Sequence, residues 1–174
     1  MDRKEADRKP NDDRKRHEYY MNIAMAVRKN ANCLGRRVGA VMVKENRIIS
    51  TGYNGTPEGF TNCLDGGCVR CRDRDVFRAK NSVGYDVCLC VHAEMNALLQ
   101  AGKLARGCTL YLAGFDVETG ELTRIWPCFL CSKMIVNSGV GSVIMRTGTE
   151  TFEEMDPIAL YRMRSREALG DEGS

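Results

Sequence analysis

Hydrophobic and polar residues alternate along this chain in segments that predict helices and strands in a regular order. Apolar side chains recur at helical spacing over residues 13–29, which predicts an amphipathic first helix packed on one face of a sheet. The runs 38–43 and 48–53 have the character of strands, and the residues between them form a turn of hairpin length.

The second half of the chain continues with alternating helical and strand segments. The pattern predicts a helix that runs to Ala101 and ends at Gly102, followed by a strand over 109–112, a helix from Pro127 to Asn137, a strand over 142–145 and a last helix over 152–168. This order predicts an α/β fold, a three-layer α-β-α sandwich around a central mixed sheet of about five strands.

The chain is long enough for one domain with its own core, at 174 residues. Residues 1–16 are charged and nearly free of apolar side chains, so we expect a mobile arm or the approach to the first helix, and a single domain over 17–174. Two segments of that domain stand out. The first is a cysteine-rich loop over residues 55–91. The second is the segment 114–126, in which apolar and polar residues alternate about a turn, and this pattern predicts a projecting β-hairpin.

Composition and charge narrow the class of protein. A net charge of +3 is too small to indicate a nucleic-acid partner, and no long apolar run or charged-then-apolar leader predicts a membrane span or a signal peptide. We therefore expect a cytoplasmic protein. In such a protein nine cysteines indicate metal ligands and a few buried thiols rather than disulfides, and Cys108 fits a buried thiol best.

Two short motifs carry the chemistry. His92-Ala93-Glu94 and the later Pro127-Cys128-Phe129-Leu130-Cys131 together form the H-x-E and P-C-x-x-C signature of zinc deaminases. One histidine and two cysteines give zinc three protein ligands and leave a fourth position for water, as in catalytic sites. Glu94 can then collect a proton from that water and deliver it to the substrate. A chance tripeptide beside a buried or redox-active cysteine pair is the weaker alternative, because both motifs occur in order and each heads a helical segment.

The spacing of these residues has a physical reason. Cys128 and Cys131 fall on one face of a helix if Pro127 is its first residue, near the positive end that favours thiolates. Of the two histidines, His17 lies in a charged stretch and is expected to be a solvated residue of the first helix, so His92 has no competitor for the metal.

With these motifs in place, the sequence resembles the cytidine deaminase superfamily over about residues 17–147. It is most similar to deoxycytidylate (dCMP) deaminases of the late-competence, phage and fungal kind. Besides the two motifs, the resemblance depends on segments 37–41 and 47–55 and on the cysteine-bearing segments 62–71 and 88–91. It implies that zinc hydroxide attacks C4 of cytosine, that dCMP is hydrolysed to dUMP, and that Glu94 shuttles the protons.

The same resemblance implies how the nucleotide is held. The backbone amide of Ala93 would bind the pyrimidine carbonyl and Asn54 the sugar hydroxyl. Trp126 either forms part of the pocket wall or anchors the hairpin to the core. The phosphate charge would come from Arg146, or from Arg36 and Arg37, each of which could instead be an ordinary surface arginine. Relatives of this kind also imply a hexamer that dCTP activates and dTTP inhibits.

A second, structural zinc is implied for the cysteine-rich loop. Cys33 matches a cysteine that in relatives joins such loop residues around a metal, and four thiolates make a closed tetrahedral site. Six candidates exceed four ligands. The first choice is Cys33, Cys63, Cys68 and Cys88, with Cys71 and Cys90 as substitutes, and independent buried thiols are the alternative.

Other functions remain open from the sequence alone. The chain could deaminate another cytosine nucleotide, a nucleoside or a purine base. Editing within nucleic acid needs a basic groove and stacking aromatics, and the aromatic content of 7% is modest. A zinc-stabilised interaction module without catalysis does not explain the presence of Glu94.

Overall fold

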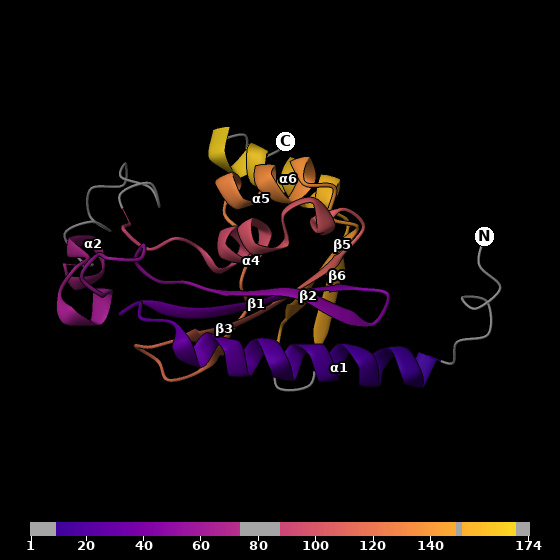
Figure 1. Cartoon of the computed structure of the whole chain (residues 1–174), viewed down its shortest axis with the longest axis horizontal. Helices are drawn as coiled ribbons and strands as arrows, with labels where there is room; N and C mark the ends of the chain where they lie inside the picture. The colour runs from indigo at the N-terminus through magenta and orange to yellow at the C-terminus, as the bar shows by residue number, and fades with distance from the viewer. Residues whose placement is uncertain (1–9, 74–87, 149–150, 170–174) are drawn as a thin grey trace.

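The computed structural model describes residues 10–73, 88–148 and 151–169, which form one mixed sheet between two layers of helices (Figure 1). Helix α1 (Pro10–Val27) covers one face of the sheet. Helices α4 (Ala93–Ala101), α5 (Phe129–Asn137) and α6 (Pro157–Leu169) cover the other. This is the predicted three-layer α/β architecture.

The sheet of the described residues has six strands in the order β2-β1-β3-β5-β6, with β4 paired to β3. The strands are β1 (Arg36–Lys44), β2 (Arg47–Tyr53), β3 (Thr109–Asp116), β4 (Leu122–Thr123), β5 (Ser142–Arg146) and β6 (Phe152–Met155). Strands β3 and β5 run parallel and the other pairs are antiparallel, so the sheet is mixed as predicted.

The connection between β1 and β2 is a tight hairpin turn. Glu45 and Asn46 both have positive φ, 51° and 60°. This is the backbone conformation of a two-residue type I′ turn, whose twist matches that of the flanking strands.

Alternation along the strands divides the core into two layers. On β1, Val41 faces α1 and packs with Tyr20, Met21 and Ala24. Its neighbour Met42 faces the other way, into the larger cluster under α4, α5 and α6. The site described below lies on the side of this larger cluster.

The ends of two predicted helices differ from the sequence-based expectation. Helix α1 begins at Pro10, so residues 10–16 of the expected arm belong to the helix, and residues 1–9 lie outside the described part. The expected helix over 152–168 is wrong at its start, because residues 152–155 pair antiparallel with β5 as strand β6. Helix α6 then begins at Pro157, after Asp156 accepts a hydrogen bond from the backbone N–H of Ala159 at 2.8 Å.

The cysteine-rich loop is closed at its two ends by backbone hydrogen bonds between Gly55 and Val91, of 3.2 and 2.8 Å. Its described parts contain the short helices η2 (Cys63–Asp65) and α2 (Val69–Arg72), and residues 74–87 lie outside the description. The expected hairpin at 114–126 takes the form of β4 folded back on the end of β3. Both segments lie beside the start of β1.

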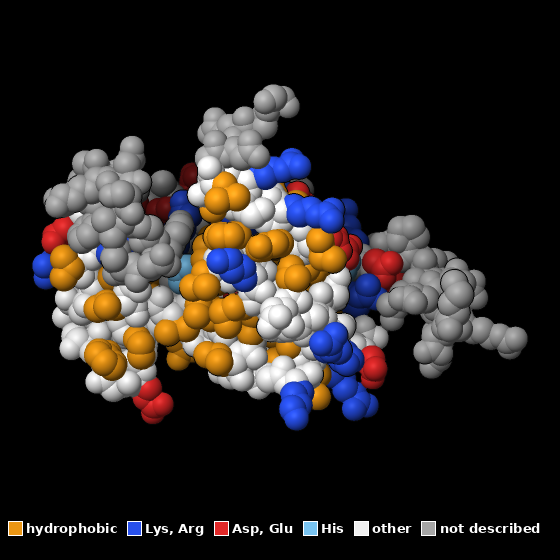
Figure 2. All heavy atoms as spheres, turned by 90° about the horizontal axis from the view of Figure 1, so that it is seen from above, with side chains coloured by type: hydrophobic (Ala, Val, Ile, Leu, Met, Phe, Trp, Pro, Cys, Tyr) orange, Lys and Arg blue, Asp and Glu red, His pale blue; other side chains and the backbone are white. Residues whose placement is uncertain are grey.

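Two further 3₁₀ turns complete the described elements, η1 (Arg28–Asn30) after α1 and η4 (Gly102–Ala105) after α4. Large apolar side chains are exposed over the face that carries α4, α5 and α6, and Figure 2 shows them gathered there among basic residues. They include Leu99, Leu104, Leu130 and Ile158. Within the described ranges, no helix is both long and apolar enough to span a bilayer.

Candidate metal centre and adjoining pocket

The two chemical motifs meet at the N-termini of α4 and α5. His92 is the N-cap of α4, with extended backbone at φ −72° and ψ 152°. Cys128 is the N-cap of α5, and its Sγ accepts a hydrogen bond from the backbone N–H of Cys131 at 3.4 Å. The helix thus begins at Phe129, slightly later than a start at Pro127 would give, because the Cys128 side chain is its cap. Both helix ends present their positive dipoles to this point.

The three candidate ligands are spaced as a tetrahedral zinc requires. Nδ1 of His92 lies 3.4 Å from Sγ of Cys128 and 3.3 Å from Sγ of Cys131. Zinc–nitrogen and zinc–sulfur bonds of ordinary length, at the tetrahedral angle, place such atoms about 3.6 Å apart. All three ligand atoms lie within 4.8 Å of one another, so the donor set fits zinc both in chemistry and in size.

Electrostatics in this trio prepare one of its members, Cys128, to bind a metal ion. The hydrogen bond with Cys131, followed by that with His92, lowers the pKa of Cys128 to about 4, so its thiol is ionised at neutral pH. The hydrogen bond with Cys128 raises the pKa of His92 to about 9 against the opposing effect of burial. The pKa of Cys131 is raised, chiefly by its hydrogen bond with Cys128. A metal ion would therefore displace protons from His92 and Cys131.

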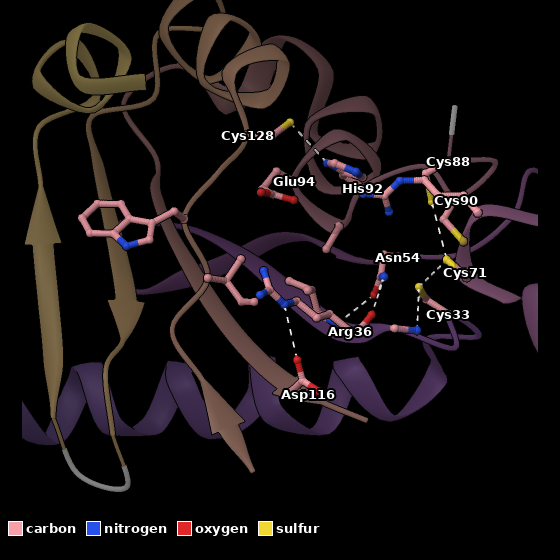
Figure 3. A pocket seen from close by; sticks show the side chains of 16 residues that line it. Cys33, Arg36, Asn54, Cys71, Cys88, Cys90, His92, Glu94, Asp116 and Cys128 are labelled. Atoms are coloured by element: carbon pink, nitrogen blue, oxygen red, sulfur yellow. Dashed lines mark hydrogen bonds and ion pairs between the residues drawn. The ribbon is translucent and has the colours of Figure 1, made fainter. Parts of the chain in front are cut away.

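Glu94 lies on the first turn of α4, only 3% exposed, and borders the same pocket. Burial raises its pKa, which is the direction expected for a carboxyl group that both accepts and donates a proton near neutral pH. Figure 3 shows Cys128 joined to His92, with Glu94 beside them.

A cavity of about 260 Å³ opens beside this trio. Its apolar wall includes Val38 and Ile125, and its polar wall includes Asn54 and Glu94. This mixed lining offers an apolar surface for a ring and polar groups that can fix its orientation.

Three of the residues implied for substrate binding line this pocket, namely Asn54, Ala93 and Trp126. The side chain of Asn54 is fixed by the sheet, because its Oδ1 accepts from the N–H of Val38 and its Nδ2 donates to the carbonyl of Arg36, both at 2.7 Å. Trp126 lines the pocket and also packs on the larger core cluster, with the Arg124 guanidinium 4.1 Å from its ring centre.

Of the implied phosphate ligands, the structure brings only Arg36 to the pocket. Arg36 pairs with Asp116 at 3.6 Å and is about half exposed. Arg146 contacts Asn22 of α1 and the ring of Phe152, on the opposite face of the sheet, so it does not reach the pocket. Arg37 alternates with Arg36 along β1 and points to the same α1 side.

Two charged residues of the pocket were not expected from the sequence, Arg70 and Asp116. Arg70 lies between Cys68 and Cys71, so the fold of the cysteines carries it to the pocket. Its position inside a C-x-x-C segment is the only sequence signal that could have indicated this.

The six cysteines of the loop and of the β1 approach form one cluster, which we call the six-cysteine cluster: Cys33, Cys63, Cys68, Cys71, Cys88 and Cys90. Four of its members line the pocket beyond His92 (Figure 3), namely Cys33, Cys71, Cys88 and Cys90. The first-choice four do not form a single group of ligands. Cys33 and Cys63 group with Cys71, and Cys68 and Cys88 also group with Cys71.

The remaining candidates lie elsewhere. Cys108 is fully buried and its thiol contacts the carbonyl of Leu104 at 3.1 Å, away from both metal groups. His17 is partly buried rather than solvated, because its Nδ1 contacts the hydroxyl of Tyr111 at 3.0 Å across the α1 interface.

Comparison with known proteins places these motifs in a family context. The family model of the cytidine and deoxycytidylate deaminase zinc-binding region matches residues 14–147. Deoxycytidylate deaminase of Saccharomyces cerevisiae is 41% identical over 138 residues, which cover 78% of this chain and 39% of that protein. The enzyme of that name from Mycobacterium phage D29 is 38% identical over 129 residues, which cover 73% of this chain and 91% of the phage protein.

Solved structures show the same fold. The crystal structure of dCMP deaminase from cyanophage S-TIM5 in apo form is 30% identical, with a TM-score of 0.56, over 90% of this chain and 94% of that one. A second structure of the cyanophage protein is a complex with dCMP and dUMP. The matched region spans about two fifths of the length of the two fungal relatives, 39% and 36%.

Proposed function

Because the chain belongs to the cytidine and deoxycytidylate deaminase family, we propose that it is a zinc-dependent hydrolase that deaminates dCMP to dUMP. The observation that carries this proposal is the convergence of His92, Cys128 and Cys131 beside the buried carboxyl of Glu94, at the edge of one small pocket. The complex of the cyanophage relative with dCMP and dUMP supports the choice of substrate.

His92, Cys128 and Cys131 would hold the catalytic zinc. When bound, that ion would supply a water activated for attack on C4 of cytosine near neutral pH. Two thiolates and a neutral imidazole balance its charge, and the positive ends of α4 and α5 favour the thiolates.

Glu94 moves the protons. Its raised pKa and its burial allow it to accept a proton from the attacking water and to donate it to the ring nitrogen, and a second transfer assists the departing amine. The carboxyl is not needed as a metal ligand, so its removal separates proton transfer from metal binding.

The start of α4 and the end of β2 orient the pyrimidine nucleotide. Ala93 is the first residue of α4, so its backbone N–H has no acceptor inside the helix and can bind the pyrimidine carbonyl. The amide of Asn54, held by β1 on one side, presents its remaining hydrogen-bonding capacity to the sugar. Trp126 supplies part of the apolar wall.

Arg36 and Arg70 would recognise the phosphate. Both line the pocket, and a guanidinium group binds phosphate oxygens through charge-assisted hydrogen bonds. Asp116 pairs with Arg36 and holds its side chain at the pocket edge.

A comparison of substrates tests this proposal. Ammonia release should be fastest with dCMP, because a site with donors for a phosphate leaves them unpaired when deoxycytidine binds. Arg36→Gln should lower kcat/KM for dCMP about tenfold and leave deoxycytidine almost unchanged. Arg37→Gln, on the other face of β1, is the matched control. Equal kcat/KM for dCMP and deoxycytidine would move the protein to the nucleoside deaminases.

We propose in addition that the six-cysteine cluster binds structural zinc and clips the loop to the start of β1. The Sγ atoms of Cys33 and Cys71 are 3.6 Å apart, and those of Cys68 and Cys88 are 3.9 Å apart. Sulfurs around a tetrahedral zinc lie about 3.8 Å from one another.

A homo-oligomer, a hexamer by family resemblance, is the proposed assembly, and dCTP and dTTP are its proposed effectors. The apolar side chains exposed over α4, α5 and α6 support an interface on that face. Light scattering with and without each nucleotide would measure the assembly and any change in it.

A further inference from the structure

The six-cysteine cluster contains more ligands than one zinc ion can use. Its sulfurs make two groups of three, in each of which all atoms lie within 4.8 Å of one another. One group holds Cys33, Cys63 and Cys71, and the other holds Cys68, Cys71 and Cys88. Cys71 therefore belongs to both groups.

Cys71 contacts one further sulfur in each group, at 3.6 Å to Cys33 and 4.0 Å to Cys88. Cys90 is the sixth sulfur of the cluster, buried beside the other five but a member of neither group of three. Cys71 is therefore the sulfur that joins the two groups, and Cys90 is the one remaining thiol of the cluster.

The number of ligands matches two metal ions. Two tetrahedral zinc ions need eight ligand positions, and six thiolates fill eight positions when two of them bind both ions. Cys71, which belongs to both groups, supplies one bridge, and Cys90, the remaining thiol of the cluster, is left to supply the other.

We propose that the six-cysteine cluster binds two zinc ions rather than one, through four terminal and two bridging thiolates. Cys33 and Cys63 are the terminal ligands of one ion, and Cys68 and Cys88 are those of the other. Cys71 and Cys90 bridge them. A single ion would leave two further thiols buried in direct contact with its ligands.

Donors around the cluster offset the negative charge of six thiolates. The backbone N–H of Leu34 points at Sγ of Cys63 and that of Gly35 at Sγ of Cys33, both at 3.4 Å. Arg70 lies within the segment that joins Cys68 to Cys71. Such donors around metal-bound sulfur stabilise the thiolate form.

This inference goes beyond the single structural zinc proposed above, and it does not depend on the deaminase activity. With the catalytic ion included, the purified protein should contain about three zinc ions per chain after removal of loosely bound metal. Cadmium NMR of the fully substituted protein should give three resonances, of which two are coupled to each other through shared sulfur. The third should disappear in Cys128→Ser while the coupled pair remains.

Variants assign the bridge. Cys71→Ser should remove both cluster ions, because it takes a ligand from each, whereas Cys63→Ser should remove only one. Cys108→Ser, a buried cysteine outside the cluster, is the matched control and should keep all the metal. Two zinc ions per chain in the wild type would overturn the inference, as would three cadmium resonances without a coupled pair. The zinc content and the cadmium spectrum of the wild type test the inference even if a cysteine variant fails to fold.

Discussion

Gly52 on β2 is a position where a single added methyl group should lower both the stability of the fold and the rate of catalysis. A Cβ atom at this residue would lie 2.3 Å from the carbonyl oxygen of Ala93 and 2.4 Å from the backbone nitrogen of Ala97. Ordinary contact begins at 3.4 Å, so Gly52→Ala forces α4 away from the sheet by about 1 Å. The displaced backbone is the segment that carries His92 and Glu94.

The size of both effects follows from this displacement. Overpacking of this kind costs about 1–3 kcal/mol of unfolding free energy, or roughly 2–12 °C in Tm for a domain of this length. A shift of about 1 Å in reacting groups can lower the rate about 10²-fold. We therefore expect Gly52→Ala to fold less stably and to lose about 10²-fold in kcat with dCMP.

Gly39→Ala is the matched control on the other face of the sheet. Its Cβ would lie 2.1 Å from the carbonyl oxygen of Ala24 on α1, which carries no site residue. It should lose as much stability but keep its kcat per folded, zinc-loaded molecule. The assay is ammonia release well below both melting temperatures, with zinc content and thermal melts measured on the same samples. Equal loss of kcat in the two variants, or wild-type kcat in Gly52→Ala, would refute the reasoning.

Three other substitutions test separate parts of the account. Glu94→Gln should keep the catalytic zinc but lower kcat by about 10²–10⁴-fold, since an amide cannot accept the proton. Glu167→Gln, on the exposed face of α6, is its control. Near-normal turnover by Glu94→Gln would exclude Glu94 as the group that moves the protons. Asn54→Ala should lower the urea concentration at which half of the protein is unfolded. It leaves the N–H of Val38 and the carbonyl of Arg36 without their hydrogen-bond partner, which costs about 1–3 kcal/mol of unfolding free energy for each group. Asn137→Ala is the control and should leave this midpoint unchanged. Burial, and after it the charge of Arg16, lowers the pKa of His17, and the charges of Glu154 and Asp13 oppose this effect. The folded protein therefore favours neutral His17. The stability that this gives is fully present above about pH 6.5 and is lost as the pH falls through the lowered pKa. Melts of the wild type and His17→Gln between about pH 5 and 8 should diverge on the acid side, and parallel curves would contradict this.

Local patterns were enough to predict most of the sheet and the centre of the site. The unbroken apolar run of β1 reflects its two covered faces. The two motifs place His92 and Cys128 at helix N-termini. Strand β6 escaped prediction because four residues are too few to distinguish a strand from a helical turn, although the Asp156-Pro157 pair marked the true start of α6.

The remaining differences concern positions that only tertiary structure determines. Arg146 ends a buried strand, and the sequence does not say which face of that strand borders the pocket. The pairing of Cys33 with Cys71 likewise joins residues far apart in the chain, so spacing alone could not group the cysteines. Arg70 enters the pocket only because the cluster folds its segment there.

The most direct test of the central claim is the product formed from dCMP by the purified, zinc-loaded protein in isotopically labelled water. The account predicts dUMP that carries the labelled oxygen at C4, with one ammonia released for each molecule formed, and almost no product from Glu94→Gln. Unchanged dCMP, with all metal sites filled and the protein folded, would contradict it.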